Sequence, residues 1–210
     1  MKHKIEKNTV QETLILPLYS RKLCTELYPN LYQDETAVRL IDEIDYDFSE
    51  AEKNSRSLMQ RFGALEVAMR QNDLAWEVRD YLKTHPSAAV FFASGVFYYF
   101  LTQQVKALVQ QMADAFSGGV LVFDAANRTA VKMIAKTWLR TAKIKDVGAY
   151  FAVSDAPKEI GEWDNRLQVT SRGYMLGYND LRDHSVSGFF RFLARVGDNG
   201  MKMQIVKIRF

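Results

Sequence analysis

Two short polar segments follow apolar runs of strand length, and this position indicates a ligand site. Ser94 and Gly95 follow the apolar run at residues 88–93, and Asp124 follows the run at residues 120–123. A small polar residue and a glycine allow a ligand to approach the backbone closely. Because ligands in open α/β sheets bind beyond the carboxyl ends of the strands, we expect both segments at one pocket. The alternative is that Gly95 only serves a turn and that the aromatic residues after it fill the core.

Other catalytic arrangements find less support in the sequence. The histidines His3, His85 and His184 lie far apart, with no cysteine or histidine at the spacing of zinc ligands. Cys24 falls on an apolar helical stripe, which is typical of a small core residue. The chain has no G-x-S-x-G, P-loop or G-x-G-x-x-G motif. We therefore expect neither a metal site nor one of these common catalytic machineries.

Length and composition limit the class of protein. A chain of 210 residues, with 48% hydrophobic and 25% charged residues, is expected to form one domain with a sizeable core. Its longest apolar stretch, residues 88–101, is shorter than the roughly 20 residues of a membrane span. A single cysteine and a charged N-terminus predict a cytoplasmic protein. Lysine and arginine are dispersed rather than clustered with aromatics, so neither nucleic acid nor membrane is an expected partner.

Hydrophobic periodicity predicts a helical N-terminal part. Apolar residues between positions 14 and 27 form a helical stripe that we expect to be interrupted near Pro17. A longer helix is predicted at residues 62–83, with Trp76 among the side chains that face a core. Residues 1–86 are therefore expected to form an all-helical cap with a lead-in helix.

From residue 87 the pattern changes to alternating strands and helices. The apolar runs at residues 88–93 and 120–123 predict strands that are covered on both faces, as in a parallel sheet. A helix is expected between them from Thr102, and another follows at residues 129–141. This order predicts βαβ units and an α/β fold.

The C-terminal part has a different pattern. Residues 167–170 and 204–210 alternate apolar and polar side chains, which predicts an edge strand or an antiparallel pair. Residues 189–195 fit either a helix or a strand. Residues 87–210 are thus expected to form the α/β core, which joins the cap in one structural domain.

Five segments along the chain carry a resemblance to a known family. In chain order they are residues 12–21, residues 44–48, Arg70 in its helix, residues 94–100 and residues 121–125. In this order they resemble the leucine carboxyl methyltransferase family, in its branch of polyketide-type O-methyltransferases. The similarity covers nearly the whole chain. It implies a class I methyltransferase that uses S-adenosylmethionine (SAM), with a Rossmann-like sheet and a helical N-terminal cap.

The resemblance has a gap between Val90 and Phe91. Family members open the sheet with a strand and a glycine-rich loop that cradles the cofactor, and an acidic residue after the next strand binds the ribose. Here residues 85–90, which look like the approach to the first strand, run directly into residues 91–95, which look like the fourth. Roughly 60 to 90 residues are missing relative to the family. Either the polypeptide lacks this segment, or the printed sequence omits a part that the polypeptide contains.

The two alternatives predict different behaviour. A real deletion leaves half of the sheet, turns residues 88–93 into an edge strand with unpaired backbone groups, and weakens or abolishes cofactor binding. It also predicts instability, or self-association into a homodimer through that edge. With the segment present, ordinary methyl transfer is expected.

The resemblance implies roles for four residues beside the cofactor. Arg70 matches a family arginine that pairs with the methionyl carboxylate of SAM. Ser94 and Gly95 match a position where the family has an acidic or small residue followed by glycine, and Ser94 departs from the acidic version. Tyr99 is expected to face the sulfonium, whose positive charge an aromatic face attracts.

For the methyl acceptor, Tyr19, Arg21 and Asp124 are predicted to bind a small molecule that carries a hydroxyl or a carboxylate. No residue stands out as a general base. The rival interpretation is a non-catalytic, truncated methyltransferase-like module that serves binding or dimerisation. A third, a carboxyl methyltransferase acting on a protein C-terminus, would require a groove for that partner.

Overall fold

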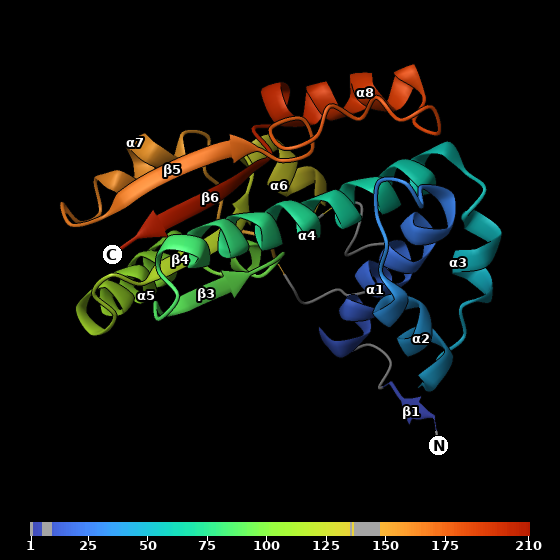
Figure 1. Cartoon of the computed structure of the whole chain (residues 1–210), viewed down its shortest axis with the longest axis horizontal. Coiled ribbons are helices and arrows are strands. Elements are labelled where there is room, and N and C mark those ends of the chain that lie inside the picture. The colour runs from blue at the N-terminus through green and yellow to red at the C-terminus, as the bar shows by residue number, and fades with distance from the viewer. Residues whose placement is uncertain (1, 6–9, 135, 137–147) are drawn as a thin grey trace.

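The computed structural model describes residues 2–5, 10–134, 136 and 148–210. A four-stranded sheet lies at one end of a long helix, and the N-terminal helices gather at its other end (Figure 1). The described helices are α1 (Val10–Leu27), α2 (Glu35–Glu43), α3 (Ser49–Asn54), α4 (Leu58–Thr84), α5 (Thr102–Ala115), α6 (Arg128–Ile134), α7 (Ala156–Gly161) and α8 (Gly188–Arg195), with a 3-10 turn η1 (Phe97–Tyr99) and a π turn η3 (Val196–Gly200). The strands are β1 (His3–Lys4), β2 (Ile44–Asp45), β3 (Val90–Ala93), β4 (Val120–Ala125), β5 (Gln168–Gly173) and β6 (Gln204–Arg209).

The main sheet has the strand order β3-β4-β6-β5. β3 and β4 are parallel and are joined through α5, which confirms the predicted βαβ unit. β6 runs antiparallel to both β4 and β5, so the antiparallel pair predicted at residues 167–170 and 204–210 is also confirmed. The protein is therefore a mixed α/β structure with a small mixed sheet.

The sheet is covered on both faces at its centre. All six residues of β4 are buried. Val120 and Val122 belong to the apolar cluster that contains Leu65 of α4, whereas Leu121 and Phe123 belong to a second cluster with α5 and α7. The alternation of side chains along a strand explains why one continuous apolar run serves two cores.

β3 is the exception, because it lies at the edge of the sheet. Among the described residues it pairs with β4 alone. Phe92 consequently keeps 44% of its surface exposed. The prediction that residues 88–93 are covered on both faces is wrong at this position. The position at the edge is the one expected for a chain that lacks the family's preceding strands.

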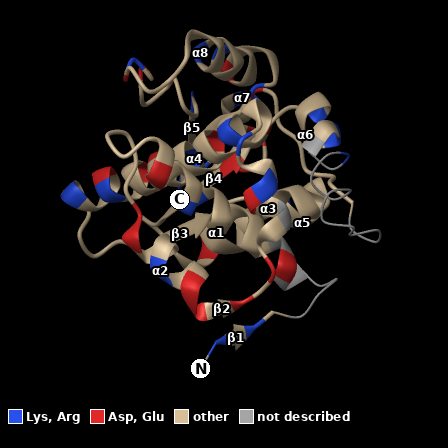
Figure 2. Cartoon of the chain, turned by 90° about the vertical axis from the view of Figure 1, so that its right-hand side faces the viewer, with Lys and Arg blue, Asp and Glu red and all other residues tan. Residues whose placement is uncertain are grey.

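The N-terminal cap contains more than helices. β1 and β2 form a separate parallel pair in which His3 lies opposite Ile44 and Lys4 opposite Asp45. The prediction of an all-helical cap is therefore wrong, because strands of two residues leave no periodicity to detect. Figure 2 shows acidic residues gathered along α2 and along β2 of this pair. α1 runs through Pro17 without a break, since packing against α4 outweighs the cost of one proline.

α4 is the helix that joins the cap to the sheet. It begins earlier than predicted, at Leu58, where the Ser57 hydroxyl accepts a hydrogen bond from the Gln60 N–H at 3.2 Å. Trp76 is 40% exposed, so the prediction that it faces the core is wrong. Its ring instead packs against Tyr178 and under the Arg172 guanidinium at the surface.

Two further predicted elements are helices in the structure. Residues 189–195, which fitted helix or strand, are helical as α8. The helix predicted at residues 129–141 is present as α6 up to Ile134, and residues 135 and 137–141 lie outside the described residues. No helix in the described part of the chain has the length and apolar character needed to cross a membrane.

Candidate functional site

One face of α4 carries charged residues where it meets the sheet and the loop after β5. Glu66, Arg70, Asp73 and Glu77 are spaced by four, three and four residues, so they lie on one side of the helix. Asp73 and Glu77 are buried, and the Arg70 side chain is only 18% exposed. Charged side chains are seldom buried without partners, so the partners of this stripe define the site.

Arg70 meets the carboxyl ends of two strands through Asp124. Arg70 Nη1 donates to Asp124 Oδ2 at 3.3 Å, and the Gly95 N–H donates to Asp124 Oδ1 at 2.5 Å. Asp124, the residue before the last one of β4, has a fully buried side chain. The structure thus brings together three of the predicted site residues, which come from α4, the end of β3 and the end of β4.

Gly95 occupies a position that favours glycine. Its φ of +68° lies in the left-handed region, where a side chain is strained. A Cβ at this position would lie 3.6 Å from Arg70 Nη2, which places the guanidinium against the backbone of the turn. The turn therefore directs the Gly95 N–H to Asp124, and the side of Gly95 that lacks a side chain lies against Arg70.

The Arg70 guanidinium lies among groups that keep it charged. Burial opposes its charge, but Asp124 and the neighbouring Glu66 and tyrosine hydroxyls raise its pKa above the ordinary arginine value. Burial likewise raises the pKa of Tyr98 and of Tyr174, so both phenols stay protonated. Tyr174 uses its hydroxyl to donate to Glu66 Oε1 at 3.0 Å.

Arg70 also retains an unused donor. Its Nε is buried and has no hydrogen-bond partner among the described residues. A buried donor without a partner is costly, and native structures usually supply one. A ligand with an acceptor group, such as a carboxylate, would satisfy this N–H.

The other predicted cofactor residues lie in the turn after β3. Ser94 is partly buried, and Tyr99 is 40% exposed in η1. Burial raises the pKa of the Tyr99 hydroxyl, and the charge of Arg70 opposes this shift. Tyr99 therefore lies within electrostatic reach of the Arg70–Asp124 pair and stays partly open to solvent.

The predicted acceptor residues Tyr19 and Arg21 have their partners inside the cap. Arg21 Nε donates to Asp34 Oδ2 at 2.8 Å. Tyr19 is buried and stacks on Phe48 with ring centroids 5.5 Å apart. Among the described residues no hydrogen bond or ion pair joins either of them to Arg70 or Asp124, and their acceptor role stays a prediction.

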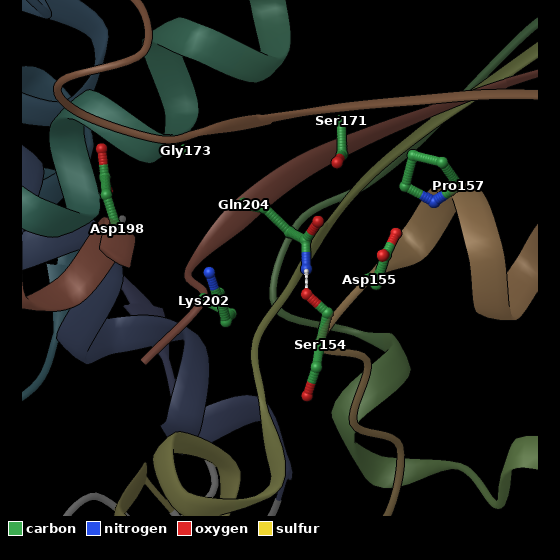
Figure 3. A pocket seen from close by; sticks show the side chains of 8 residues that line it. All are labelled: Ser154, Asp155, Pro157, Ser171, Gly173, Asp198, Lys202 and Gln204. Atoms are coloured by element: carbon green, nitrogen blue, oxygen red, sulfur yellow. Dashed lines mark hydrogen bonds between the residues drawn. The ribbon is translucent and has the colours of Figure 1, made fainter. Parts of the chain in front are cut away.

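A separate pocket lies between β5, β6 and α7 (Figure 3), at the same end of the sheet as Asp124, since Gln204 of β6 pairs with Ala125 of β4. It has a volume of about 400 Å³ and contains none of the predicted site residues. Its lining residues are Ser154, Asp155, Pro157, Ser171, Gly173, Asp198, Lys202 and Gln204. Gln204 closes one wall by donating through Nε2 to the carbonyls of Val153 and Ser154.

The loop after β5 is held by the acidic residues of α4. Asp73 accepts from the Met175 N–H at 2.9 Å and from Asn179 Nδ2 at 3.1 Å. Glu77 accepts from the Tyr178 hydroxyl at 2.7 Å and also pairs with Lys207 of β6. No role for Asp73 and Glu77 is predicted from the sequence. Their spacing on the buried side of α4 was the available signal.

Gly177 makes this loop possible. A Cβ there would lie 1.9 Å from the Gly173 carbonyl oxygen, so Gly177→Ala is expected to lower the free energy of unfolding by about 2 kcal/mol. The matched variant is Gly63→Ala within α4, where a Cβ meets nothing within 4 Å. That change is expected to stabilise by up to about 1 kcal/mol, since alanine favours helix. Urea unfolding of both variants checks the pair, and equal shifts would contradict this account of the loop.

The structure bears on two kinds of chemistry that the sequence does not support, a cysteine nucleophile and a metal site. Cys24 is fully buried, and burial raises the pKa of its thiol to about 12, so it is not a thiolate nucleophile. The described residues contain no group of three or more histidine, cysteine or acidic side chains that could hold a metal ion.

Comparison of the chain with protein-family models, with curated proteins and with solved structures finds no match. The function therefore has to be argued from the site itself.

Proposed function

We propose that this chain is a SAM-dependent O-methyltransferase that acts on a small-molecule hydroxyl or carboxylate, built on half of a Rossmann-like class I sheet. A single observation supports this proposal. Arg70, Gly95 and Asp124 come from three separate segments of the resemblance and meet in one buried cluster at the carboxyl ends of β3 and β4. Open α/β sheets bind ligands at this end of their strands.

The residues present fit the amino-acid end of the cofactor. The buried Nε of Arg70 lacks an acceptor, and a carboxylate would supply one beside the bare backbone of Gly95. The nucleoside end has no comparable support, because the sequence lacks the glycine-rich loop and the acidic residue that the family uses for it. We therefore expect binding that depends mainly on Arg70.

The roles of this chain's own residues follow from that fit. When bound, SAM supplies a methyl group on a positively charged sulfur. Arg70 would hold the carboxylate, and Asp124 keeps the guanidinium charged and oriented. Tyr99 would offer its half-exposed ring to the positive charge. Methyl transfer is a displacement at carbon, so the main task of the protein is to hold the acceptor oxygen in line.

The test is calorimetric titration of the full chain with S-adenosylhomocysteine. We expect micromolar affinity, and Arg70→Lys is expected to weaken it at least tenfold, because lysine keeps the charge but loses the planar donor pair. Arg79→Lys, an exposed change on the same helix, is the matched control and should leave the affinity unchanged. Equal affinities for the two variants, with both folded by circular dichroism, would reject the role of Arg70.

A second candidate is a non-catalytic binding or dimerisation module. The observation in its favour is that Arg70 Nη1 is already paired with Asp124, while β3 ends the sheet where the family continues it. In this case the titration gives no heat, and the ligand leaves the melting temperature unchanged. Detectable binding that requires Arg70 decides for the methyltransferase.

A further inference from the structure

We propose that two copies of this chain associate through their β3 strands, which pair antiparallel about a two-fold axis and join two four-stranded sheets into one. This inference goes beyond the proposed function, because it does not depend on cofactor binding. It names the occupant of an edge that the fold leaves open.

The backbone of β3 offers hydrogen-bonding groups on its outer side. The Ala89 carbonyl accepts from the Val120 N–H at 2.9 Å, so the backbone at Ala89 faces β4. Because backbone groups alternate along a strand, Phe91 and Ala93 also face β4, whereas Val90 and Phe92 point their N–H and C=O groups outward. With β4 as the sole strand partner among the described residues, these outward groups form a template for another strand.

The sequence around β3 has none of the features that protect a sheet edge. Natural edges carry lysines, inward-pointing charges, prolines within the strand or bulges. Residues 87–105 contain no charged residue and no proline. An uncharged, regular edge strand is therefore open to pairing.

Apolar side chains beside the edge supply the hydrophobic part of the contact. Phe92 and three residues that follow β3 within the same uncharged segment are between 42% and 53% exposed. These three are Val96, Phe100 and Leu101. Several large apolar side chains exposed within one short segment are a mark of protein association.

A second copy fits this edge better than a different partner. In an antiparallel pair about a two-fold axis at Phe91, Val90 of each strand lies opposite Phe92 of the other, so the outward groups of both strands satisfy each other. The absence of charge removes like-charge repulsion between identical surfaces. It also leaves nothing that would select an oppositely charged partner.

The test is the molar mass of the full chain in solution, measured by light scattering over a range of concentrations. We expect a species of twice 24.2 kDa that dissociates on dilution. A monomer at every concentration would overturn the proposal. Assemblies that grow beyond the dimer with concentration would also overturn it, because pairing about a two-fold axis occupies the edge of both copies and leaves none for a third.

Three variants locate the contact. Phe92→Pro removes an outward N–H without touching a bond to β4, and Phe92→Ala removes the ring but keeps that N–H. We expect the dimer dissociation constant to rise at least tenfold for Phe92→Pro over Phe92→Ala. Phe92→Lys, which brings two positive charges together, should give a monomer even if the proline variant fails to fold.

The matched control is Phe189→Lys on α8, where the side chain is 51% exposed away from β3. It should leave the dimer intact. If Phe92→Lys and Phe189→Lys dimerise equally, the β3 edge is not the contact. Titration with S-adenosylhomocysteine is read separately, so failure of cofactor binding and failure of dimerisation remain distinguishable.

Discussion

Replacing Asp124 with alanine is expected to lower the free energy of unfolding by about 3–5 kcal/mol, the range for removing one partner of a buried ion pair. The Asp124 side chain is fully buried and accepts from both Arg70 Nη1 and the Gly95 N–H. Its removal leaves the Arg70 charge without its anionic partner and the turn after β3 without its anchor. Urea unfolding followed by circular dichroism measures the loss.

The control for this change is Asp80→Ala on α4. Asp80 forms an exposed pair with Lys83 at 3.4 Å, and exposed pairs contribute little. We expect the stability of this variant to stay within about 0.5 kcal/mol of the original chain. A loss at Asp124 no larger than this would show that the buried cluster does not hold the two strand ends together.

A double variant separates the charge from the packing. Arg70→Met combined with Asp124→Leu removes both charges and leaves apolar side chains in their place. Buried ion pairs replaced in this way are often neutral in stability, so the double variant is expected to recover the part of the loss that comes from the unpaired charge, while the Gly95 N–H still lacks its acceptor. It should at the same time abolish binding of S-adenosylhomocysteine. Recovery of stability without recovery of binding would establish that the pair is kept for the ligand.

The parts of the fold that the sequence predicts are those with a strong local pattern. The apolar run at residues 120–123 predicts a strand covered on both faces, and β4 is completely buried. The alternation at residues 204–210 predicts the antiparallel strand β6. In both cases the pattern lies within one element, so no knowledge of distant residues is needed.

The errors come from contacts between distant residues. Trp76 falls on an apolar stripe, but Tyr178 and Arg172, about a hundred positions later, hold its ring at the surface. Asp73 and Glu77 look like solvated helix positions until the loop after β5 provides their hydrogen-bond partners. Periodicity measures how apolar a face is, and it gives no information about which polar groups will meet there.

The sequence likewise predicts one part of the candidate site and misses another. The sequence places Gly95 and Asp124 at strand ends, which is where the structure has them. It does not reveal that Asp124 and Arg70 satisfy each other, because the residue that pairs with a buried charge depends on the packing of α4 across the sheet. Tyr19 and Arg21 belong to the predicted site through the resemblance alone, and the resemblance does not indicate their partners in the cap, Phe48 and Asp34.

The stability of the protein is expected to fall as the pH rises from about 5 to 8. Burial raises the pKa of Asp73 from 3.8 to about 7, although hydrogen bonds from Met175 and Asn179 oppose the shift. Between these two pKa values the folded protein keeps a proton that the unfolded chain has released. The stabilisation is therefore complete below pH 4 and is lost as the pH passes 7.

The size of this effect follows from the shift of Asp73. A change of about three pH units at 1.36 kcal/mol each sets an upper bound of about 4 kcal/mol between the two limits. Burial also raises the pKa of Asp198 to about 7, which adds to the effect in the same direction. Denaturant unfolding at pH 5 and pH 8 measures the difference directly.

Asp73→Asn tests whether Asp73 is the main source of this slope, which is the fall of the free energy of unfolding between pH 5 and pH 8. Asparagine has the shape of the neutral carboxyl and can pair with Asn179 if that amide rotates, so the loop keeps its anchor. We expect the variant to lose most of the stability difference between pH 5 and pH 8, and to match or exceed the original chain at pH 8. Asp80→Asn, on an exposed part of the same helix, should retain the full slope. An unchanged slope in Asp73→Asn would mean that Asp73 is ionised in the folded protein throughout this range, and that its hydrogen bonds outweigh its burial.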